Sequence, residues 1–372
     1  MIDCDPMEPM NQPSSTGAQP TTSHAYSAFI RACRGERTDR TPVWFMRQAG
    51  RSLPEYRAIR GEGSILDAIA QPDLATEITL QPVRRYGTDA AILYSDIMVP
   101  VHAIGFGVDI KPGIGPVVDQ PFSNVADLDR FRDFDADVDC SYVAETVRNL
   151  VSELSVPLIG FAGAPFTVAS YLVEGAPSRS HFRTKALMYA DPDLWFALTD
   201  RLADLAIESI RSQVANGACA AQLFDSWVGA LSPMDYERFV LPSSSKVISA
   251  VKSLGVPVIH FGVNTGELLG LMAAAGADVV GVDWRTPLDV ARGRVPSDVS
   301  LQGNLDPAVV AAGWDATEPQ VLDVLRRGGG NPGGGGGHIF NLGHGVTPDI
   351  DPGVLENVAD LVHAQPVTLD QD

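Results

Sequence analysis

Eight short apolar runs recur along the chain, and longer amphipathic stretches separate them. Each run has the length of a buried strand and gives way to polar or glycine residues, which is typical of strands that leave a core. The runs cover residues 43–46, 90–94, 156–161, 219–224, 256–261, 277–282, 300–302 and 338–342. Strands that alternate with helices predict a parallel sheet, because a crossover helix returns the chain to the same edge.

The stretches between the runs show the apolar periodicity of helices. Pro192 stands where the first turn of a helix tolerates proline, and Gly217 and Gly255 stand where helices end. We predict a helix from residue 27 to 33, and further helices over residues 72–86, 142–154, 192–216, 236–254, 265–275 and 352–364.

Eight strand–helix units are the number that closes a (β/α)8 TIM barrel, so we predict one α/β barrel domain over residues 24–366. An open, doubly wound sheet is the alternative. It is disfavoured because no run leads into a G-x-G-x-x-G turn or a P-loop.

Three segments depart from the repeat. Residues 1–23 are rich in Pro, Ser, Thr, Gln and Gly and predict a disordered tail. Residues 106–134, rich in Gly, Pro and Asp, predict a loop or a small hairpin. Residues 328–337 contain eight glycines in ten positions, which predicts a flexible loop before the last strand.

The charge of the chain limits its partners. The net charge is −19, with 27 basic and 46 acidic side chains, which argues against nucleic acid or an anionic membrane as a partner. No apolar run reaches the roughly 18 residues of a membrane span, and the N-terminus does not resemble a signal peptide. The four cysteines are scattered, as expected of a reduced, cytoplasmic protein.

One segment opposes this acidity. Residues 31–60 contain eight arginines and three acidic residues, a local charge of +5. Arg47 and Arg51 directly follow the first predicted strand. A guanidinium at the end of a core strand needs an anion or water, so the pair predicts a carboxylate or phosphate ligand.

In a barrel the site lies where the strands end at their C-terminal face. The side chains there are Arg47, Arg51, Asp96, Tyr171, Asp225, Ser226, Asp283, Asn304, Asp306 and His344. Asp96 fits a helix cap as well as a catalytic group, and no G-x-S-x-G elbow surrounds Ser226. His260 lies in an apolar run and is interpreted as a core histidine with its hydrogen bonds satisfied. No thiolates stand at the strand ends, so a zinc site is not expected.

Several segments carry a resemblance to a known family. Residues 44–57, WFMRQAGRSLPEYR, closely resemble the signature of the uroporphyrinogen decarboxylases of haem biosynthesis. Further matching segments are LYSD (93–96), GFAGAPFT (160–167), YLVEG (171–175), FDSW (224–227), QGNLDP (302–307) and NLGHG (341–345). The resemblance implies a (β/α)8 barrel, usually a homodimer. It also implies substrate binding by Arg47, Gln48, Ala49, Gly50, Arg51, Asp96, Tyr171, Ser226 and His344.

The implied reaction converts the four acetate side chains of uroporphyrinogen III to methyl groups and gives coproporphyrinogen III. A pyrrole protonated at carbon accepts the electrons of each departing carboxylate, so neither a cofactor nor a metal is expected. Asp96 would stabilise the cation on the ring, and Arg47 or Arg51 would orient the departing carboxylate. Two alternatives remain: a zinc-dependent methyltransferase on the same barrel, whose thiolate ligands are missing here, and a non-catalytic porphyrinogen-binding barrel.

Overall fold

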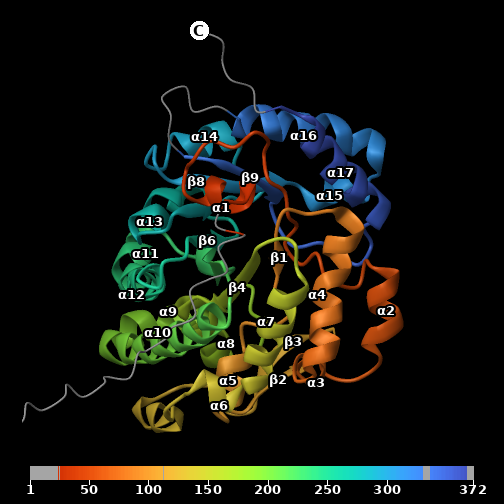
Figure 1. Ribbon diagram of the computed structural model, residues 1–372. Coiled ribbons are helices and arrows are strands. Elements are labelled where there is room, and N and C mark those ends of the chain that lie inside the picture. The colour runs from red at the N-terminus through yellow and green to blue at the C-terminus, as the bar shows by residue number, and fades with distance from the viewer. Residues whose placement is uncertain (1–23, 25, 112, 330–335, 367–372) are drawn as a thin grey trace, which may run out of the picture.

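A computed structural model describes residues 24, 26–111, 113–329 and 336–366. Its centre is a curled, parallel seven-stranded sheet in the order β1-β4-β5-β6-β7-β8-β9, and helices surround the sheet in Figure 1. The strands are β1 (Ala91–Ile92), β4 (Leu158–Gly163), β5 (Ala220–Asp225), β6 (Val258–Gly262), β7 (Val279–Gly281), β8 (Ser300–Leu305) and β9 (His338–Leu342). Every neighbouring pair is parallel, which confirms the predicted alternation for seven of the eight runs.

The curl of the sheet brings distant strands together across its interior. Trp44 Nε1 donates to Gln302 Oε1 on β8 (3.0 Å), and Gln302 Nε2 donates to Gln222 Oε1 on β5 (3.0 Å). Since β6 and β7 separate these two strands in the sheet, the side chains can meet only if the sheet bends back on itself.

The first predicted strand differs from the expectation. Residues 43–46 form a single parallel bridge, Val43 to Phe340 of β9, and no regular strand. Side chains take the backbone donors that a neighbouring strand would use. Val43 N donates to Asp89 Oδ2 (2.8 Å), Phe45 N to Gln48 Oε1 (3.1 Å) and Met46 N to Asn341 Oδ1 (2.9 Å). The run is buried as predicted, but side chains accept from three of its four backbone N–H groups, so it forms no regular strand.

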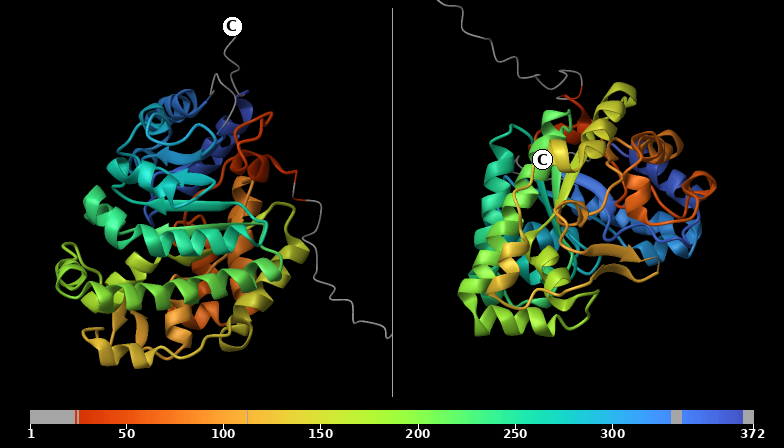
Figure 2. Two further views of the ribbon diagram at one scale, coloured as in Figure 1. Left: turned by 90° about the vertical axis from the view of Figure 1, so that its left-hand side faces the viewer. Right: turned by 90° about the horizontal axis from the view of Figure 1, so that it is seen from below.

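The principal helices follow the sequence signals closely. Helices α4 (Pro72–Tyr86) and α17 (Pro352–Ala364) have the predicted bounds, and α7 (Ser141–Glu153) and α10 (Pro192–Ala215) differ from the prediction by one residue. The predicted helix 236–254 is two helices, α11 (Pro233–Phe239) and α12 (Leu241–Lys252), which meet at Val240. Pro242 explains the break, because its ring has no N–H and fits only the first turn of a new helix. Figure 2 shows α10 and α12 side by side on one flank of the sheet.

Further elements complete the layer around the sheet. They are α1 (Ala28–Cys33), α2 (Pro54–Arg60), α3 (Ile65–Ile69), α5 (Val99–Ala103), α6 (Ala136–Asp139), α8 (Pro165–Glu174), α9 (Phe182–Ala190), α13 (Leu269–Ala274), α14 (Leu288–Arg292), α15 (Pro307–Ala311) and α16 (Trp314–Gly328). Three 3-10 turns accompany them: η1 (Val125–Arg130), η2 (Val228–Ala230) and η3 (Gly266–Leu268). Within the described part of the chain, no helix is long and apolar enough to cross a membrane.

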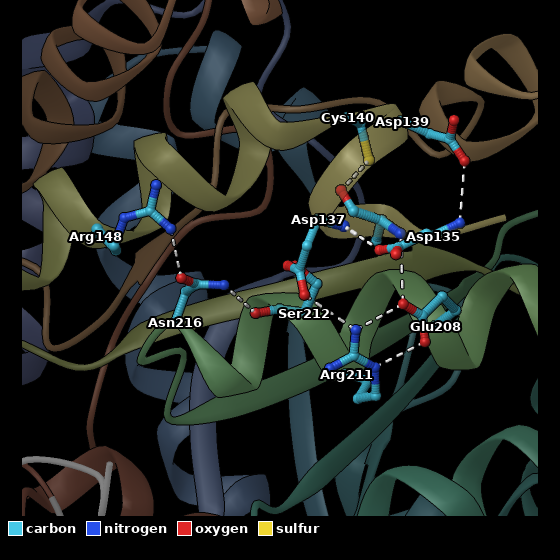
Figure 3. Close-up of polar contacts among 10 residues, drawn as sticks. Asp135, Asp137, Asp139, Cys140, Arg148, Glu208, Arg211, Ser212 and Asn216 are labelled. Carbon is cyan, nitrogen blue, oxygen red and sulfur yellow. Dashed lines mark hydrogen bonds and ion pairs between the residues drawn. The ribbon is translucent and has the colours of Figure 1, made fainter. Parts of the chain in front are cut away.

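The predicted excursion at 106–134 contains an antiparallel hairpin, β2 (Val108–Lys111) with β3 (Gly115–Val118), which confirms that prediction. The chain then returns through α6, which polar contacts fasten to α10 (Figure 3). Ser212 and Arg211 both donate to Asp137, and Arg211 Nε also donates to Glu208 Oε2 (2.7 Å). The Ser212 hydroxyl, followed by Arg211, holds the pKa of Asp137 below its ordinary value. This contact remains charged at neutral pH and joins the excursion to the helical layer.

Two of the predicted unstructured segments lie partly or wholly outside the described residues. The tail at 1–23 is one, and positions 330–335 of the glycine run are the other. At the two ends of that run, Gly328 closes α16 and Gly337 N donates to Ser300 Oγ (2.8 Å).

Candidate functional site

The loops that leave the strands are linked to one another at the C-terminal edge of the sheet. Asn264, after β6, donates from its backbone to Asp283 after β7. Asn304 Nδ2 at the end of β8 donates to the Asp283 carbonyl (2.8 Å), and Gly343 N after β9 donates to the Leu305 carbonyl (2.7 Å). These contacts give the candidate residues a rigid base.

Arg47 occupies an unusual backbone position. Its φ of 59° lies in the left-handed region, which costs a residue other than glycine roughly 1–2 kcal/mol. The next residue holds the turn in place, because the buried Gln48 amide accepts from Phe45 N and donates to the Ala90 carbonyl (3.2 Å). Gly345 supplies the space for the arginine stem, since a Cβ at this position would lie 2.4 Å from Arg47 Cδ. The guanidinium itself is exposed, and within the described part of the chain it forms no hydrogen bond or ion pair.

Asp96 follows β1 and lies half-buried beside an apolar wall. Its Oδ1 accepts from Met98 N (2.9 Å), so it does cap the turn before α5. Burial raises the pKa of the carboxyl above its ordinary value, while the Met98 amide and the Arg47 charge act in the opposite direction. Its other oxygen has no hydrogen bond within the described residues, so the carboxylate can both cap the turn and receive a donor from a ligand.

Tyr171 of α8 stacks on Trp227, with ring centroids 3.9 Å apart. Burial raises the pKa of the phenol to about 12, with a smaller contribution from the nearby Asp96 charge. The hydroxyl therefore stays protonated at neutral pH and can donate to a carboxylate. Ser226 directly precedes Trp227 at the end of β5 and is half-buried.

His344 follows β9, and its ring lies edge-on to Trp284 at 6.1 Å. Burial lowers the pKa of the imidazole, and the Arg47 and Arg285 charges add to this shift. The ring is therefore neutral at pH 7 and has one N–H to donate.

These interactions show which of the predicted residues lie together. The Arg47 charge acts on Asp96, Tyr171 and His344, so those four side chains lie within electrostatic range of one another around Arg47. Ser226 joins them through its neighbour Trp227. No described contact links the exposed Arg51 side chain to the other four. The side-chain amide and the backbone N–H of Gln48 are both used inside the protein, so within the described residues the backbone N–H groups of Ala49 and Gly50 remain available for a ligand.

The sequence reasoning missed two residues and misinterpreted a third. Trp227 stacks on Tyr171, and Arg285 lies against Trp284 (3.9 Å) within range of His344. His260 is fully buried as predicted, but both of its ring nitrogens lack a hydrogen-bond partner, so its interpretation as a satisfied core histidine is wrong.

Comparison with known proteins decides the family. A family model described as uroporphyrinogen decarboxylase matches residues 25–365. The chain belongs to the uroporphyrinogen decarboxylase family. Two relatives in this family are each named uroporphyrinogen decarboxylase. The Salinispora tropica protein is 59% identical over 340 residues, 91% of this chain and 90% of the relative. The Streptomyces coelicolor protein is 57% identical over 357 residues, 96% of this chain and 99% of the relative.

One solved structure of another protein shares the fold of this chain. A methyltransferase from Methanosarcina mazei superposes with a TM-score of 0.72 over 90% of this chain and 97% of its own, at 19% sequence identity. At that identity the likeness shows the fold alone. The catalytic assignment therefore depends on the family match and on the side chains described above.

Proposed function

We propose that this chain decarboxylates the four acetate side chains of uroporphyrinogen III to methyl groups and releases coproporphyrinogen III. The observation that carries the proposal is the Arg47 side chain, which is exposed and unpaired within the described residues and whose charge acts on Asp96, Tyr171 and His344. Family membership supports the same activity. Methyl transfer is not favoured, because residues 260–262 and 343–344 (His-Phe-Gly and Gly-His) offer no thiolate to a zinc ion.

The substrate carries eight carboxylates, and the proposed contacts have the matching chemistry. Arg47 and Arg51 supply positive charge, and the backbone of Ala49 and Gly50 supplies amide donors, while Gln48 N donates to the Phe45 carbonyl (2.9 Å) and holds the turn. Protonated Tyr171, neutral His344 and the Ser226 hydroxyl are hydrogen-bond donors for carboxylates at the rim of the ring. Tyr171, His344 and Ser226 are neutral donors, so they can bind a carboxylate without placing a further positive charge in the site.

Asp96 has a different role in this proposal. A pyrrole protonated at a ring carbon is a cation, and it accepts the electron pair released when the acetate C–C bond breaks and CO2 departs. The methylene carbon then takes a proton, and the ring carbon returns one. A carboxylate that faces the pyrrole N–H groups stabilises the cation throughout, and the half-buried, low-dielectric surroundings of Asp96 strengthen that interaction. The ring itself is the electron sink, so this scheme uses no cofactor.

We also infer that the sheet closes into a (β/α)8 barrel, in which residues 42–44 take the place of the eighth strand. Trp44 N donates to the Phe340 carbonyl (3.3 Å) on one side, and Asp89 N donates to the Val43 carbonyl (2.8 Å) on the other. These bonds support closure between β9 and β1. The single domain proposed for residues 24–366 follows from this closure.

The activity is tested by incubating the purified, metal-stripped protein with uroporphyrinogen under anaerobic conditions and separating the products by carboxylate number. We expect stepwise appearance of seven-, six-, five- and four-carboxylate products. Intact eight-carboxylate material that remains tightly bound would indicate a binding protein instead. Activity that returned only with added zinc and a thiol acceptor would reopen methyl transfer.

We further propose that the protein works in the cytoplasm as a homodimer. The described cysteines Cys33, Cys140 and Cys219 are free thiols, which fits a reducing compartment. The dimer is inferred from the family resemblance. Sedimentation equilibrium is expected to give twice the 39.6 kDa chain mass, and a value equal to one chain would contradict the dimer.

A further inference from the structure

A cluster of polar side chains lies behind the site, between the sheet and the helices that cover it. It consists of Thr167 on α8, Asp225 on β5, Tyr236 on α11, Ser244 on α12 and His260 on β6. All five side chains have 0% exposure, so none of them can touch a substrate.

The cluster is connected to the site by a chain of contacts. Asp225 Oδ1 accepts from Thr167 Oγ1 (2.8 Å), and Asp225 Oδ2 lies 3.6 Å from His260 Nε2. Thr167 Oγ1 in turn accepts from Trp227 N (3.3 Å), which follows the candidate ligand Ser226.

The Trp227 ring connects these buried contacts with side chains at the surface of the site. Tyr171 stacks on it at 3.9 Å, and the His181 ring lies 4.8 Å from it. Ser226, Trp227 and Tyr171 therefore form one wall, which we call the 226–171 wall. Besides the peptide bond from Asp225 to Ser226, the Thr167 hydroxyl joins the Asp225 carboxylate to this wall through Trp227 N.

The polar character of the cluster has no explanation in stability alone. Asp225 Oδ2 and both His260 nitrogens have no hydrogen-bond partner within the described residues, while the Tyr236 and Ser244 hydroxyls lie close enough to interact with each other. Burying such groups is costly, and apolar side chains of similar volume would give a more stable core. The contact from Asp225 through Thr167 to the wall supplies a functional reason.

We propose that His260, Asp225 and Thr167 are positioning residues that fix the 226–171 wall during the four successive decarboxylations. This inference rests on the proposed function. The substrate loses one carboxylate at each step, so a partly processed ring has fewer anchors. A wall fixed from behind keeps Ser226 and Tyr171 in place for the remaining carboxylates, and a loosened wall releases intermediates early.

The experiment compares two substitutions at one position. Thr167→Val keeps the shape of the side chain but removes the hydroxyl, and Thr167→Ser keeps the hydroxyl. The matched control is Thr317→Val on α16, which is equally buried and loses a hydroxyl that donates to the Gly313 carbonyl (2.8 Å). Thermal unfolding midpoints measure the structural effect of all three variants.

We expect Thr167→Val to lower kcat/KM roughly tenfold, mainly through KM, because small displacements of binding groups are expensive in a preorganised site. Five- to seven-carboxylate intermediates should accumulate in free solution. Thr167→Ser and Thr317→Val should stay within about twofold of wild type. His260 lies at the other end of the contacts that run through Asp225 and Thr167, so His260→Gln should shift the products in the same direction as Thr167→Val.

Two results would overturn the proposal. One is a Thr167→Val protein with a lowered unfolding midpoint but wild-type KM and product distribution. The other is a Thr167→Ser protein as impaired as Thr167→Val.

A binding measurement separates this proposal from the activity. The oxidised, eight-carboxylate porphyrin does not decarboxylate, and its binding is followed by quenching of intrinsic fluorescence. If the wild-type protein turned over no substrate, the proposed function would fail. Weaker porphyrin binding by Thr167→Val than by Thr167→Ser would still support the positioning role of Thr167. Equal affinity of both variants would refute it.

Discussion

Replacing Asp96 with asparagine is expected to lower kcat by roughly 100- to 1,000-fold, the usual effect of removing one electrostatic stabiliser of a transition state. The asparagine oxygen can still accept from Met98 N, so the turn before α5 keeps its cap. The substitution therefore removes charge with little change in shape. Single-turnover decarboxylation measures the chemical step directly, and porphyrin affinity should change much less than the rate.

The pH profile provides a second test of Asp96. Burial raises the pKa of its carboxyl above the ordinary value of 3.8. Below the raised pKa the group is protonated and neutral, so the rate should fall as the pH decreases through that pKa. In Asp96→Asn this acid limb should disappear.

A matched control for Asp96→Asn is Asp351→Asn. Asp351 Oδ1 accepts from Gly353 N (2.9 Å), the same type of contact two residues ahead, at the start of α17 on the surface. Its activity should equal that of wild type. An Asp96→Asn protein with near-normal turnover would exclude Asp96 as the stabiliser.

Local signals in the sequence predicted much of the fold. Pro72 and Gly87 mark the two ends of α4, and the apolar run at 338–342 coincides with β9. The failure at residues 43–46 has a clear cause. Two of the three side-chain acceptors of that run, Asp89 and Asn341, come from distant parts of the chain, and local pattern does not reveal such partners. Pro242 is a sequence signal for the division of 236–254 into two helices. The apolar periodicity continues on both sides of it and therefore predicts one long helix.

The candidate site was predictable only where residue type and position at a strand end agreed. Arg47, Asp96 and His344 meet this condition, and the structure shows that the Arg47 charge acts on the other two, while their roles stay a prediction. It did not hold for Trp227, because an aromatic residue after a strand is most often part of the core. Its contact with Tyr171 depends on how α8 packs on β5. The unsatisfied nitrogens of His260 likewise depend on the placement of Asp225 on the neighbouring strand.

Removal of the Arg47 charge should have the second largest effect. Arg47→Met keeps most of the stem that packs against Gly345 and removes the guanidinium. A charge-assisted hydrogen bond contributes about 1.5–3 kcal/mol, so kcat/KM should fall roughly 10- to 100-fold. If Arg47 mainly binds a substrate carboxylate, most of the loss will appear in KM; if it orients the departing carboxylate, it will appear in kcat.

The control for Arg47→Met is Arg37→Met, which removes an exposed arginine from the same basic segment. It tests whether the net charge of residues 31–60 is sufficient for binding or whether the charge must be at Arg47. We expect wild-type kinetics for Arg37→Met, and equal losses in both variants would favour general attraction. The effects of the substitutions at Arg47 and Asp96 are also coupled. Because the Arg47 charge lowers the pKa of Asp96, Arg47→Met should move the acid limb of the pH profile to higher pH. An unmoved limb would mean that the group titrating in the profile is not Asp96.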